Sequence, residues 1–209
     1  MHKKIIPLFL TFLLVGCNRI DKTNKYIDLV NHCLKEKAMT NNVSLGYKYY
    51  MPKGVIKLQD YDYNQVFLID KTTIYLYVDI VSYYNKKEEK STKSNNAIYY
   101  EAIDNNGKKG YIEITKDKSQ YYLKISYHYS KIEAYLNENE LNKTITIASI
   151  ILNSIQYNDK AIEKVLKGDF GEFSEVTYEV NKPEDASNNF SQYLEEYVQK
   201  EKKEQKPDE

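Results

Sequence analysis

Through the middle of the chain, apolar and polar residues alternate with a period of two, the pattern of strands that bury one face and expose the other. The clearest example is residues 73–84, where Ile74 and Leu76 alternate with Tyr75 and Tyr77. The segments predicted as strands are residues 65–69, 73–84, 97–103, 110–115, 121–129 and 131–136. Asn106-Gly107 lies between two of them and predicts a two-residue hairpin turn. The pattern therefore predicts an antiparallel meander.

Helical periodicity replaces this alternation on both sides of the predicted sheet. Apolar residues recur at i, i+3, i+4, i+7 and i+8 from Tyr26 to Leu34, which forms one stripe of an amphipathic helix. A second helix is predicted from about Asn139 to Ile155. Together these elements predict an α+β fold, an antiparallel sheet meander with N- and C-terminal helices packed on one face.

A third helical stripe lies near the C-terminus and predicts a helical C-terminal extension. Its apolar members are Phe190, Tyr193, Leu194, Tyr197 and Val198. Such a helix either docks on the domain, which is the commoner outcome, or presents its apolar side to a partner. Residues 199–209 contain only Gln, Lys, Glu, Pro and Asp, so we expect them to form a solvated end.

Composition limits the classes of function. The length of 209 residues suits one domain with an extension. Basic and acidic residues number 30 each, so the chain lacks the surplus of Lys and Arg that nucleic-acid binding needs, and no nucleic-acid partner is expected. Only 7 Gly argue against glycine-rich phosphate loops, and 3 His leave few ligands for a metal site, so we expect neither cofactor nor metal. The 22 Tyr suit a pleated, half-exposed sheet or reflect codon bias.

The N-terminus has the pattern of an export signal. Lys3 and Lys4 precede an uncharged apolar run over residues 5–16, which as a helix would rise only about 18 Å, short of the roughly 30 Å core of a bilayer. The run ends in Leu-Val-Gly-Cys at residues 14–17, which resembles the lipobox of bacterial lipoproteins. In that family a diacylglyceryl group, carrying fatty acids such as palmitate, is attached to the Cys sulfur, and the signal is cut just before it. The alternative is an apolar N-terminal helix with an incidental Cys17.

This resemblance implies a protein anchored through Cys17 at the cell membrane, on its extracytoplasmic face. Cutting before Cys17 removes Lys3 and Lys4 from the 30 basic residues and none of the 30 acidic ones, so the remaining side chains sum to −2. That charge offers no attraction to anionic lipids, so the acyl chains must hold the protein there. The expected organisation is a signal peptide (1–16), a tether (17–24), an α+β domain (25–157) and a C-terminal extension (158–209).

The order of elements resembles that of the Mog1/PsbP-like α/β/α domains, several of which are bacterial lipoproteins. The sequence Gly-Tyr-x-Tyr-Tyr-x-Pro-x-Gly runs from Gly46 to Gly54, and the closing helix ends Ile-Leu-Asn-Ser-Ile-x-Tyr at residues 151–157. The chain departs from the family at Val55, where the family usually has Trp. The resemblance implies a non-catalytic binding or assembly role and carries over no catalytic residue.

Known catalytic and metal motifs are absent from the sequence. Asp60, Asp62 and Asn64 imitate the start of a calcium loop. However, Gln65 stands where that loop needs Gly, and Lys71 stands where it needs a bidentate carboxylate. The chain has no Gly-x-Ser-x-Gly, Cys-x-x-Cys or His-Glu-x-x-His motif. We therefore do not expect an enzyme.

Two reactive side chains stand alone in the sequence. Cys33 lies on the apolar stripe of the first helix, where a Cys is usually a small buried residue, the alternatives being a nucleophile or half of an intermolecular disulfide. His128 lies on a polar strand face and is interpreted as a surface residue, because a general base or metal ligand would need oriented partners.

Six tyrosines are expected on the outer face of the sheet: Tyr75, Tyr77, Tyr83, Tyr99, Tyr111 and Tyr122. Asp79, Glu101 and Glu113 are expected among them. Tyr is enriched at binding surfaces, but exposed Tyr also simply pairs across strands, and both interpretations stay open.

We therefore expect a membrane-anchored surface lipoprotein that acts as a non-catalytic binding or assembly module. Its partner would be an envelope protein or a cell-wall polymer. The alternative is an anchored cell-envelope hydrolase, in which carboxylates such as Asp79 and Glu113 would have to converge in a cleft.

Overall fold

A computed structural model describes residues 25–87 and 91–168 of the chain. The signal peptide, the tether with Cys17 and the C-terminal stripe predicted above lie outside these residues. Within the two described ranges, no helix is both long enough and apolar enough to cross a membrane.

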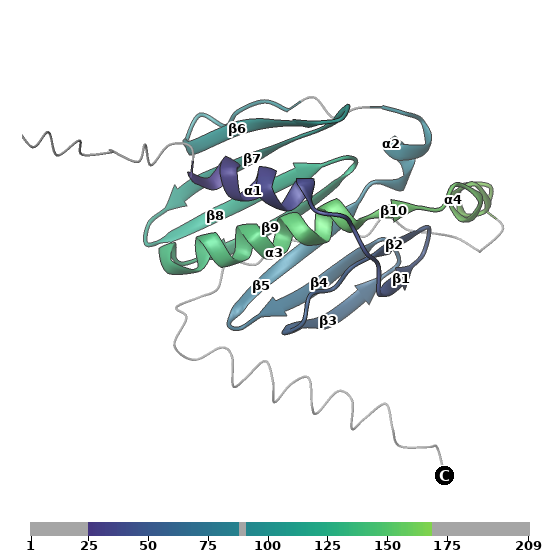
Figure 1. Cartoon of the computed structure of the whole chain (residues 1–209), viewed down its shortest axis with the longest axis horizontal. Helices are drawn as coiled ribbons and strands as arrows, with labels where there is room; N and C mark the ends of the chain where they lie inside the picture. Colours follow the sequence, from purple (N-terminus) through teal and green to yellow (C-terminus); the bar gives the residue numbers. More distant parts are fainter. Residues whose placement is uncertain (1–24, 88–90, 169–209) are drawn as a thin grey trace, which may run out of the picture.

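A seven-stranded antiparallel sheet forms the centre of the molecule (Figure 1). In spatial order its strands are β3 (Val55–Tyr61), β4 (Asn64–Ile69), β5 (Thr72–Val78), β9 (Ser130–Leu136), β8 (Gln120–Tyr127), β7 (Lys108–Asp117) and β6 (Ala97–Asn105). The predicted meander is therefore confirmed for β6 to β9, which lie side by side in chain order. The predicted hairpin turn is confirmed as well, since Asn106 and Gly107 join β6 to β7 with φ values of 54° and 78°.

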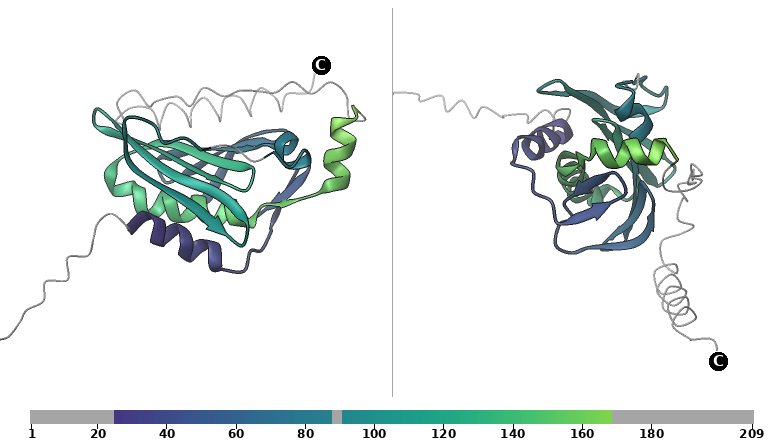
Figure 2. Two further views of the ribbon diagram at one scale, coloured as in Figure 1. Left: turned by 90° about the horizontal axis from the view of Figure 1, so that it is seen from above. Right: turned by 90° about the vertical axis from the view of Figure 1, so that its right-hand side faces the viewer.

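Two long helices lie on one face of this sheet (Figure 2). They are α1 (Lys25–Lys35) and α3 (Leu141–Ser154), which follows a short 3₁₀ turn at Glu138–Glu140. The helices pack against each other, with α3 over β8 and β9 and α1 toward β6. We call this the inner face of the sheet and the opposite side the outer face.

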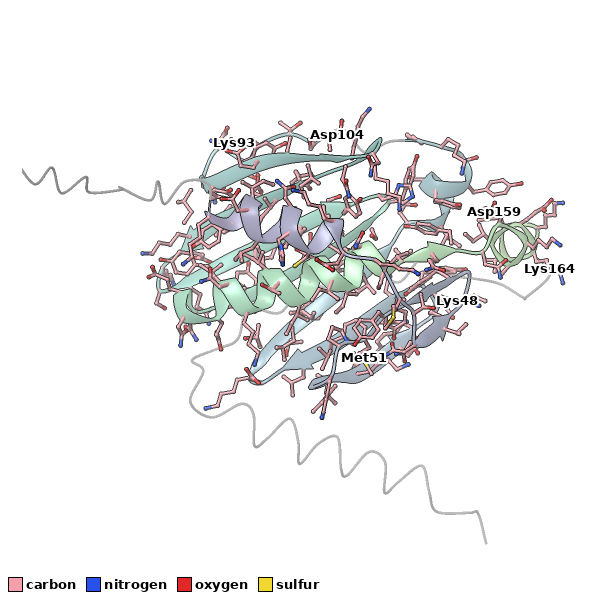
Figure 3. The ribbon with its side chains drawn as sticks, viewed as in Figure 1. Lys48, Met51, Lys93, Asp104, Asp159 and Lys164 are labelled. Atoms are coloured by element: carbon pink, nitrogen blue, oxygen red, sulfur yellow. The ribbon has the colours of Figure 1, made fainter. Side chains whose placement is uncertain are left out.

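A three-stranded sheet and two short helices complete the described fold. β1 (Asn42–Ser44), β2 (Tyr47–Tyr49) and β10 (Gln156–Tyr157) pair antiparallel, with β2 in the middle. α2 (Ile80–Tyr84) follows β5, and α4 (Asp159–Leu166) follows β10 and contacts α2. In Figure 3, Asp159 and Lys164 lie on α4 at the end of the molecule. The chain is thus a mixed protein of helices and antiparallel sheets, richer in strand than the sequence pattern predicted.

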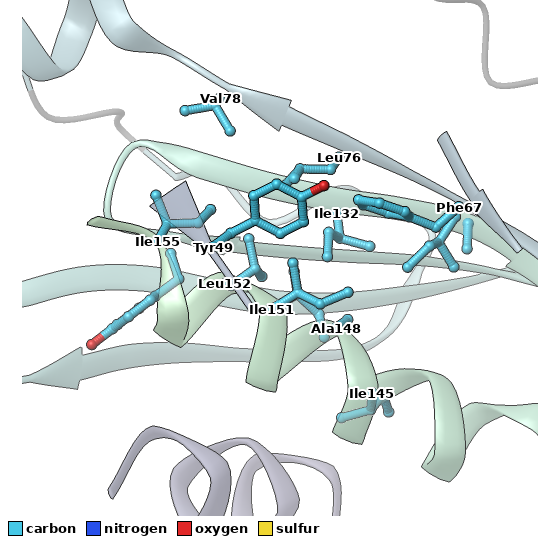
Figure 4. Packing of buried hydrophobic residues seen from close by; sticks show 14 of the residues in the cluster. Tyr49, Phe67, Leu76, Val78, Ile132, Ile145, Ala148, Ile151, Leu152 and Ile155 are labelled. Atoms are coloured by element: carbon cyan, nitrogen blue, oxygen red, sulfur yellow. The ribbon is translucent and has the colours of Figure 1, made fainter. Parts of the chain in front are cut away.

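The hydrophobic core lies between the inner face, the two long helices and the small sheet. Phe67 and Leu76 from the large sheet meet Tyr49 from β2 and Ile151 from α3, and all four side chains are fully buried (Figure 4). The small sheet therefore closes the side of the core that α1 does not reach. Burying aliphatic and aromatic side chains of this size is the dominant stabilising contribution to such a fold.

Two features of the fold differ from the sequence pattern. The strand predicted over residues 73–84 ends at Val78, because Asp79 starts α2 by accepting a hydrogen bond from the Ser82 N–H at 2.8 Å. The pattern also missed β3 and the short strands of the small sheet. Those short strands have two or three residues each, too few to show a period.

Candidate functional site

A continuous row of side chains crosses the outer face of the large sheet. Tyr75 of β5 lies opposite Glu133 of β9, which lies opposite Lys124 of β8. Lys124 lies opposite Glu113 of β7, and Glu113 lies opposite Tyr100 of β6. Because directly paired residues point to the same side of a sheet, the five side chains form one row of alternating aromatic, acidic and basic groups.

Glu133 is the electrostatic centre of this row. Its side chain is buried, at 5% exposure, and its Oε1 lies 3.2 Å from the Nζ of Lys131 and 3.6 Å from the Nζ of Lys124. Two ammonium groups so close offset the cost of burying the carboxylate. Burial raises the pKa of Tyr122, and the charge of Glu133 and a hydrogen bond to it raise that pKa further.

Aromatic rings extend the row on both sides. The ring centroids of Tyr122 and Tyr135 lie 4.8 Å apart, and the Nζ of Lys131 lies 4.7 Å from the centroid of Tyr77. Tyr77 and Tyr122 are half-buried, so part of each ring stays accessible. Half-exposed rings beside ammonium groups can contact apolar, aromatic and charged groups of a ligand.

At β6 and β7 the outer face is closed by the loop that precedes β6. Glu113, at 3% exposure, accepts a hydrogen bond from the Ser94 N–H at 2.8 Å and one from its hydroxyl at 2.7 Å. The Tyr100 hydroxyl lies 2.9 Å from Oγ of Ser91. This part of the loop is therefore fastened to the sheet.

Four of the six tyrosines predicted on the outer face lie there: Tyr75, Tyr77, Tyr111 and Tyr122. Tyr99 does not. A bulge between Ala97 and Tyr99 shifts the register of β6, and the Tyr99 hydroxyl accepts a hydrogen bond from the Ile27 N–H of α1 at 3.0 Å. The predicted position of Glu101 is also wrong, because Glu101 pairs with Ile112, whose side chain belongs to the core.

Tyr83 also lies away from the outer face, because it belongs to α2 and not to a strand. Its ring stacks on Tyr157 of β10 at 3.8 Å between centroids and 14° between planes, and its hydroxyl lies 2.9 Å from Oδ1 of Asp159. Burial, followed by the hydrogen bond to Asp159, raises the pKa of Tyr83 to about 12.

Tyr83 is part of an aromatic group at one end of the molecule, which we call the hairpin cluster: Tyr83, His128, Tyr129 and Tyr157. His128 and Tyr129 form the turn between β8 and β9. The Tyr129 ring meets Tyr83 edge-on at 5.7 Å, and the Tyr157 hydroxyl donates to the His128 carbonyl at 2.8 Å. Sequence alternation could not predict this cluster, because its members come from three separate segments.

The turn in the hairpin cluster has an unusual backbone. His128 and Tyr129 have φ values of 48° and 64°, in the left-handed region that two-residue hairpin turns usually fill with Asn and Gly. Ring packing and the hydrogen bond from Tyr157 hold the turn in this conformation. Burial, and then Lys108 and Lys86, lower the pKa of His128 to about 4, so the ring is neutral at pH 7.

The carboxylates considered for a hydrolase do not form a site. Asp79 caps α2, whereas Glu113 binds Ser94. Two strands, β9 and β8, separate the strand that ends before Asp79 from the strand that carries Glu113, so the backbones lie roughly 14 Å apart.

Other reactive groups are likewise accounted for within residues 25–87 and 91–168. No group of three or more His, Cys, Asp or Glu side chains there is arranged to hold a metal ion. Cys33 is buried, and burial raises the pKa of its thiol. A buried thiol with a raised pKa is a poor nucleophile.

Comparison with known proteins gives no family for this chain. No family model matches it, and no curated protein matches it either. The side chains described above, with the mixed chemistry of the outer face among them, are therefore the basis for inferring its function.

Proposed function

We propose that this chain is a bacterial surface lipoprotein, anchored through Cys17 at the extracytoplasmic face of the cell membrane, that acts as a non-catalytic binding or assembly module. Its α+β domain of residues 25–157 is proposed to be Mog1/PsbP-like. Residues 158–209 form a C-terminal extension with an amphipathic helix.

One observation carries the binding role, the mixed chemistry of the outer face. Tyr77 and Tyr122 offer half-buried rings, while Lys124 and Lys131 flank the buried Glu133. Interface cores favour aromatic side chains, because a ring supplies a large contact area with little loss of conformational entropy. The face suits an envelope protein or a cell-wall polymer that brings both apolar and charged groups.

The anchor is tested by Cys17→Ser in the native host. The wild-type protein should take up labelled fatty acid and stay in the membrane fraction, because two acyl chains on one residue hold a protein firmly to a bilayer. The variant should lose both the label and the membrane association. Retention of the unlabelled variant in the membrane fraction would contradict the anchor.

The binding face is tested by affinity capture of partners from solubilised native membranes. Tyr77→Ala combined with Tyr122→Ala should reduce recovery of a saturable partner by about tenfold or more, the usual effect of truncating aromatic residues at the centre of an interface. The matched control is Tyr84→Ala, a tyrosine of α2 that is 43% exposed and lies off this face. Equal recovery by the two variants would remove the outer face as the binding surface.

A further inference from the structure

The outer face contains buried apolar side chains that do not belong to the core. Val66, Leu68 and Tyr75 are 5%, 7% and 8% exposed, yet all three stand outside the core cluster that the inner face forms with the helices. They share the outer face of β4 and β5, since Val66 pairs with Tyr75 and Leu68 with Thr73. Both long helices lie on the opposite side of the sheet (Figure 2).

The described part of the loop before β6, residues 91–96, makes its hydrogen bonds to the outer face away from this apolar area. Ser91 and Ser94 reach the outer face at Tyr100 and Glu113, on β6 and β7. β5, β9 and β8 lie between β7 and β4 in the sheet. The area around Val66 therefore has the character of a docking surface for a further apolar element.

The sequence that follows the described residues contains such an element. Phe190, Tyr193, Leu194, Tyr197 and Val198 recur at helical spacing and would form a single apolar stripe. A stripe of this width on a short helix is stable mainly when it is packed against another apolar surface. The acidic Glu195 and Glu196 lie beside the stripe, and the half-exposed Lys124 and Lys131 lie on the outer face. The two surfaces are thus complementary in both apolar character and charge.

The connecting chain is long enough to bring them together. Residues 169–189 separate the end of the described chain from the stripe, and a segment of that length spans up to roughly 70 Å when extended. Seven strands at their usual spacing make a sheet only about 30 Å wide. Every position on the outer face is therefore within reach from Gly168.

We propose that residues 190–198 form a helix that packs its apolar stripe on the outer face over β4, β5 and β9, so that the chain covers its own binding surface. This inference rests on the proposed function in one respect: a partner that uses the outer face must displace the segment. The C-terminal segment then competes with the partner for the outer face and lowers the apparent affinity of the protein for that partner.

The docking is tested by hydroxyl-radical footprinting of tyrosines in the full chain, with no partner present. Leu194→Asp places a charge in the stripe, whereas the matched control Gln192→Asp places it on the polar side of the same helix. In Leu194→Asp, labelling of Tyr75 should rise by about tenfold, the protection that a docking free energy of about 1.4 kcal/mol provides. The control should label like the wild type.

Two outcomes would overturn the inference. One is unchanged labelling of Tyr75 in Leu194→Asp. The other is protection that disappears on dilution of the wild type, because it would identify the occupant as a second copy of the chain. Labelling of Tyr49, which is fully buried in the core, checks that the variant stays folded. Where Tyr49 labelling rises, Tyr197→Asp repeats the test at a second stripe position, and unchanged labelling of Tyr75 there overturns the inference.

Partner capture separates this inference from the proposed function. Leu194→Asp should recover more partner than Gln192→Asp, since the competitor is released. If Tyr75 labelling rises in Leu194→Asp but no partner is recovered, the result supports docking of the segment and contradicts the binding role.

Discussion

At the turn between β8 and β9, His128 and Tyr129 adopt a strained backbone conformation in which their side chains contact distant segments of the chain. A left-handed backbone costs roughly 1–2 kcal/mol for each residue with a Cβ atom. At this turn the rings pack on Tyr83 and Tyr157, and the carbonyl of His128 accepts a hydrogen bond. The strain is thus offset by contacts that join the hairpin to α2 and β10.

A neutral, half-buried His128 makes stability depend on pH. Its pKa falls from 6.5 in the unfolded chain to about 4 in the folded protein, so between these values the unfolded chain binds a proton that the folded chain does not. Stability should therefore fall as the pH drops from about 6.5 to 4. His128→Asn removes this contribution and suits the positive φ.

Urea unfolding of His128→Asn and of the control His32→Asn tests this pH dependence. We compare the free energy of unfolding of His128→Asn with that of the wild type at two pH values. The difference, variant minus wild type, should be about 1 kcal/mol more favourable to the variant at pH 4.5 than at pH 7.5, after allowance for solvent screening of the half-exposed ring. His32→Asn, at an exposed position of α1, is the matched control for replacing a histidine by asparagine. The same offset from wild type at both pH values would contradict the role of His128.

At the scale of elements, alternation predicts strand faces only while the register is regular. It was correct for Tyr75 and Tyr77, in the middle of β5. It was wrong for Tyr99, because a bulge adds a residue to β6 without any change in composition, and for Tyr83, because Asp79 starts a helix. Asp is a common N-cap residue, and here its carboxylate accepts a hydrogen bond from the backbone N–H of Ser82, so the helix begins where alternation predicts a continuing strand.

The pairing of β7 with β8 requires glycine at position 110, which the sequence alone does not reveal. A Cβ atom at Gly110 would lie 2.0 Å from the carbonyl oxygen of Ser126, on the backbone of the paired strand β8. Neither strand can yield without breaking the ladder between β7 and β8. Gly110→Ala should therefore destabilise the protein by about 3 kcal/mol or more, within the range of the severest single substitutions.

Gly107→Ala is the matched control, three residues earlier in the hairpin turn. A Cβ atom there meets open space, and the φ of 78° is the only obstacle, so the expected loss is about 1 kcal/mol. The free energies of unfolding of both variants, measured in urea, test the difference. A loss at Gly110 no greater than that at Gly107 would show that the β7–β8 ladder relaxes to admit the methyl group.

For the whole molecule, the sequence predicted the class of fold and the side on which the helices pack. Both depend on the period of apolar residues, which burial enforces. The small sheet and the burial on the outer face could not be predicted, because they depend on which distant segments meet. Val66 and Leu68 belong to an unbroken apolar run in β4, so hydrophobicity does not distinguish their face of the strand from the face that carries Phe67.

Net charge provides a whole-molecule test of the proposed attachment. Without residues 1–16 the side chains sum to −2, from 28 basic and 30 acidic residues after loss of Lys3 and Lys4, so electrostatic attraction to an anionic bilayer contributes nothing. Washing native membranes in about 1 M salt, where the Debye length is only about 3 Å, should therefore release none of the wild-type protein. Release by salt would indicate a peripheral, charge-dependent attachment and contradict the anchor.

The proposed attachment would give the bulges at the two sheet edges a role against edge-to-edge pairing. β3 and β6 are the outermost strands, and the register shifts between Lys57 and Gln59 in one and between Ala97 and Tyr99 in the other. Molecules tethered to one membrane diffuse in a plane and meet repeatedly, so two regular edges would be free to join into a continuous ribbon. An irregular edge on each side would interrupt that pairing, so under the proposed attachment many copies could crowd on the same surface while each sheet ends with its own chain.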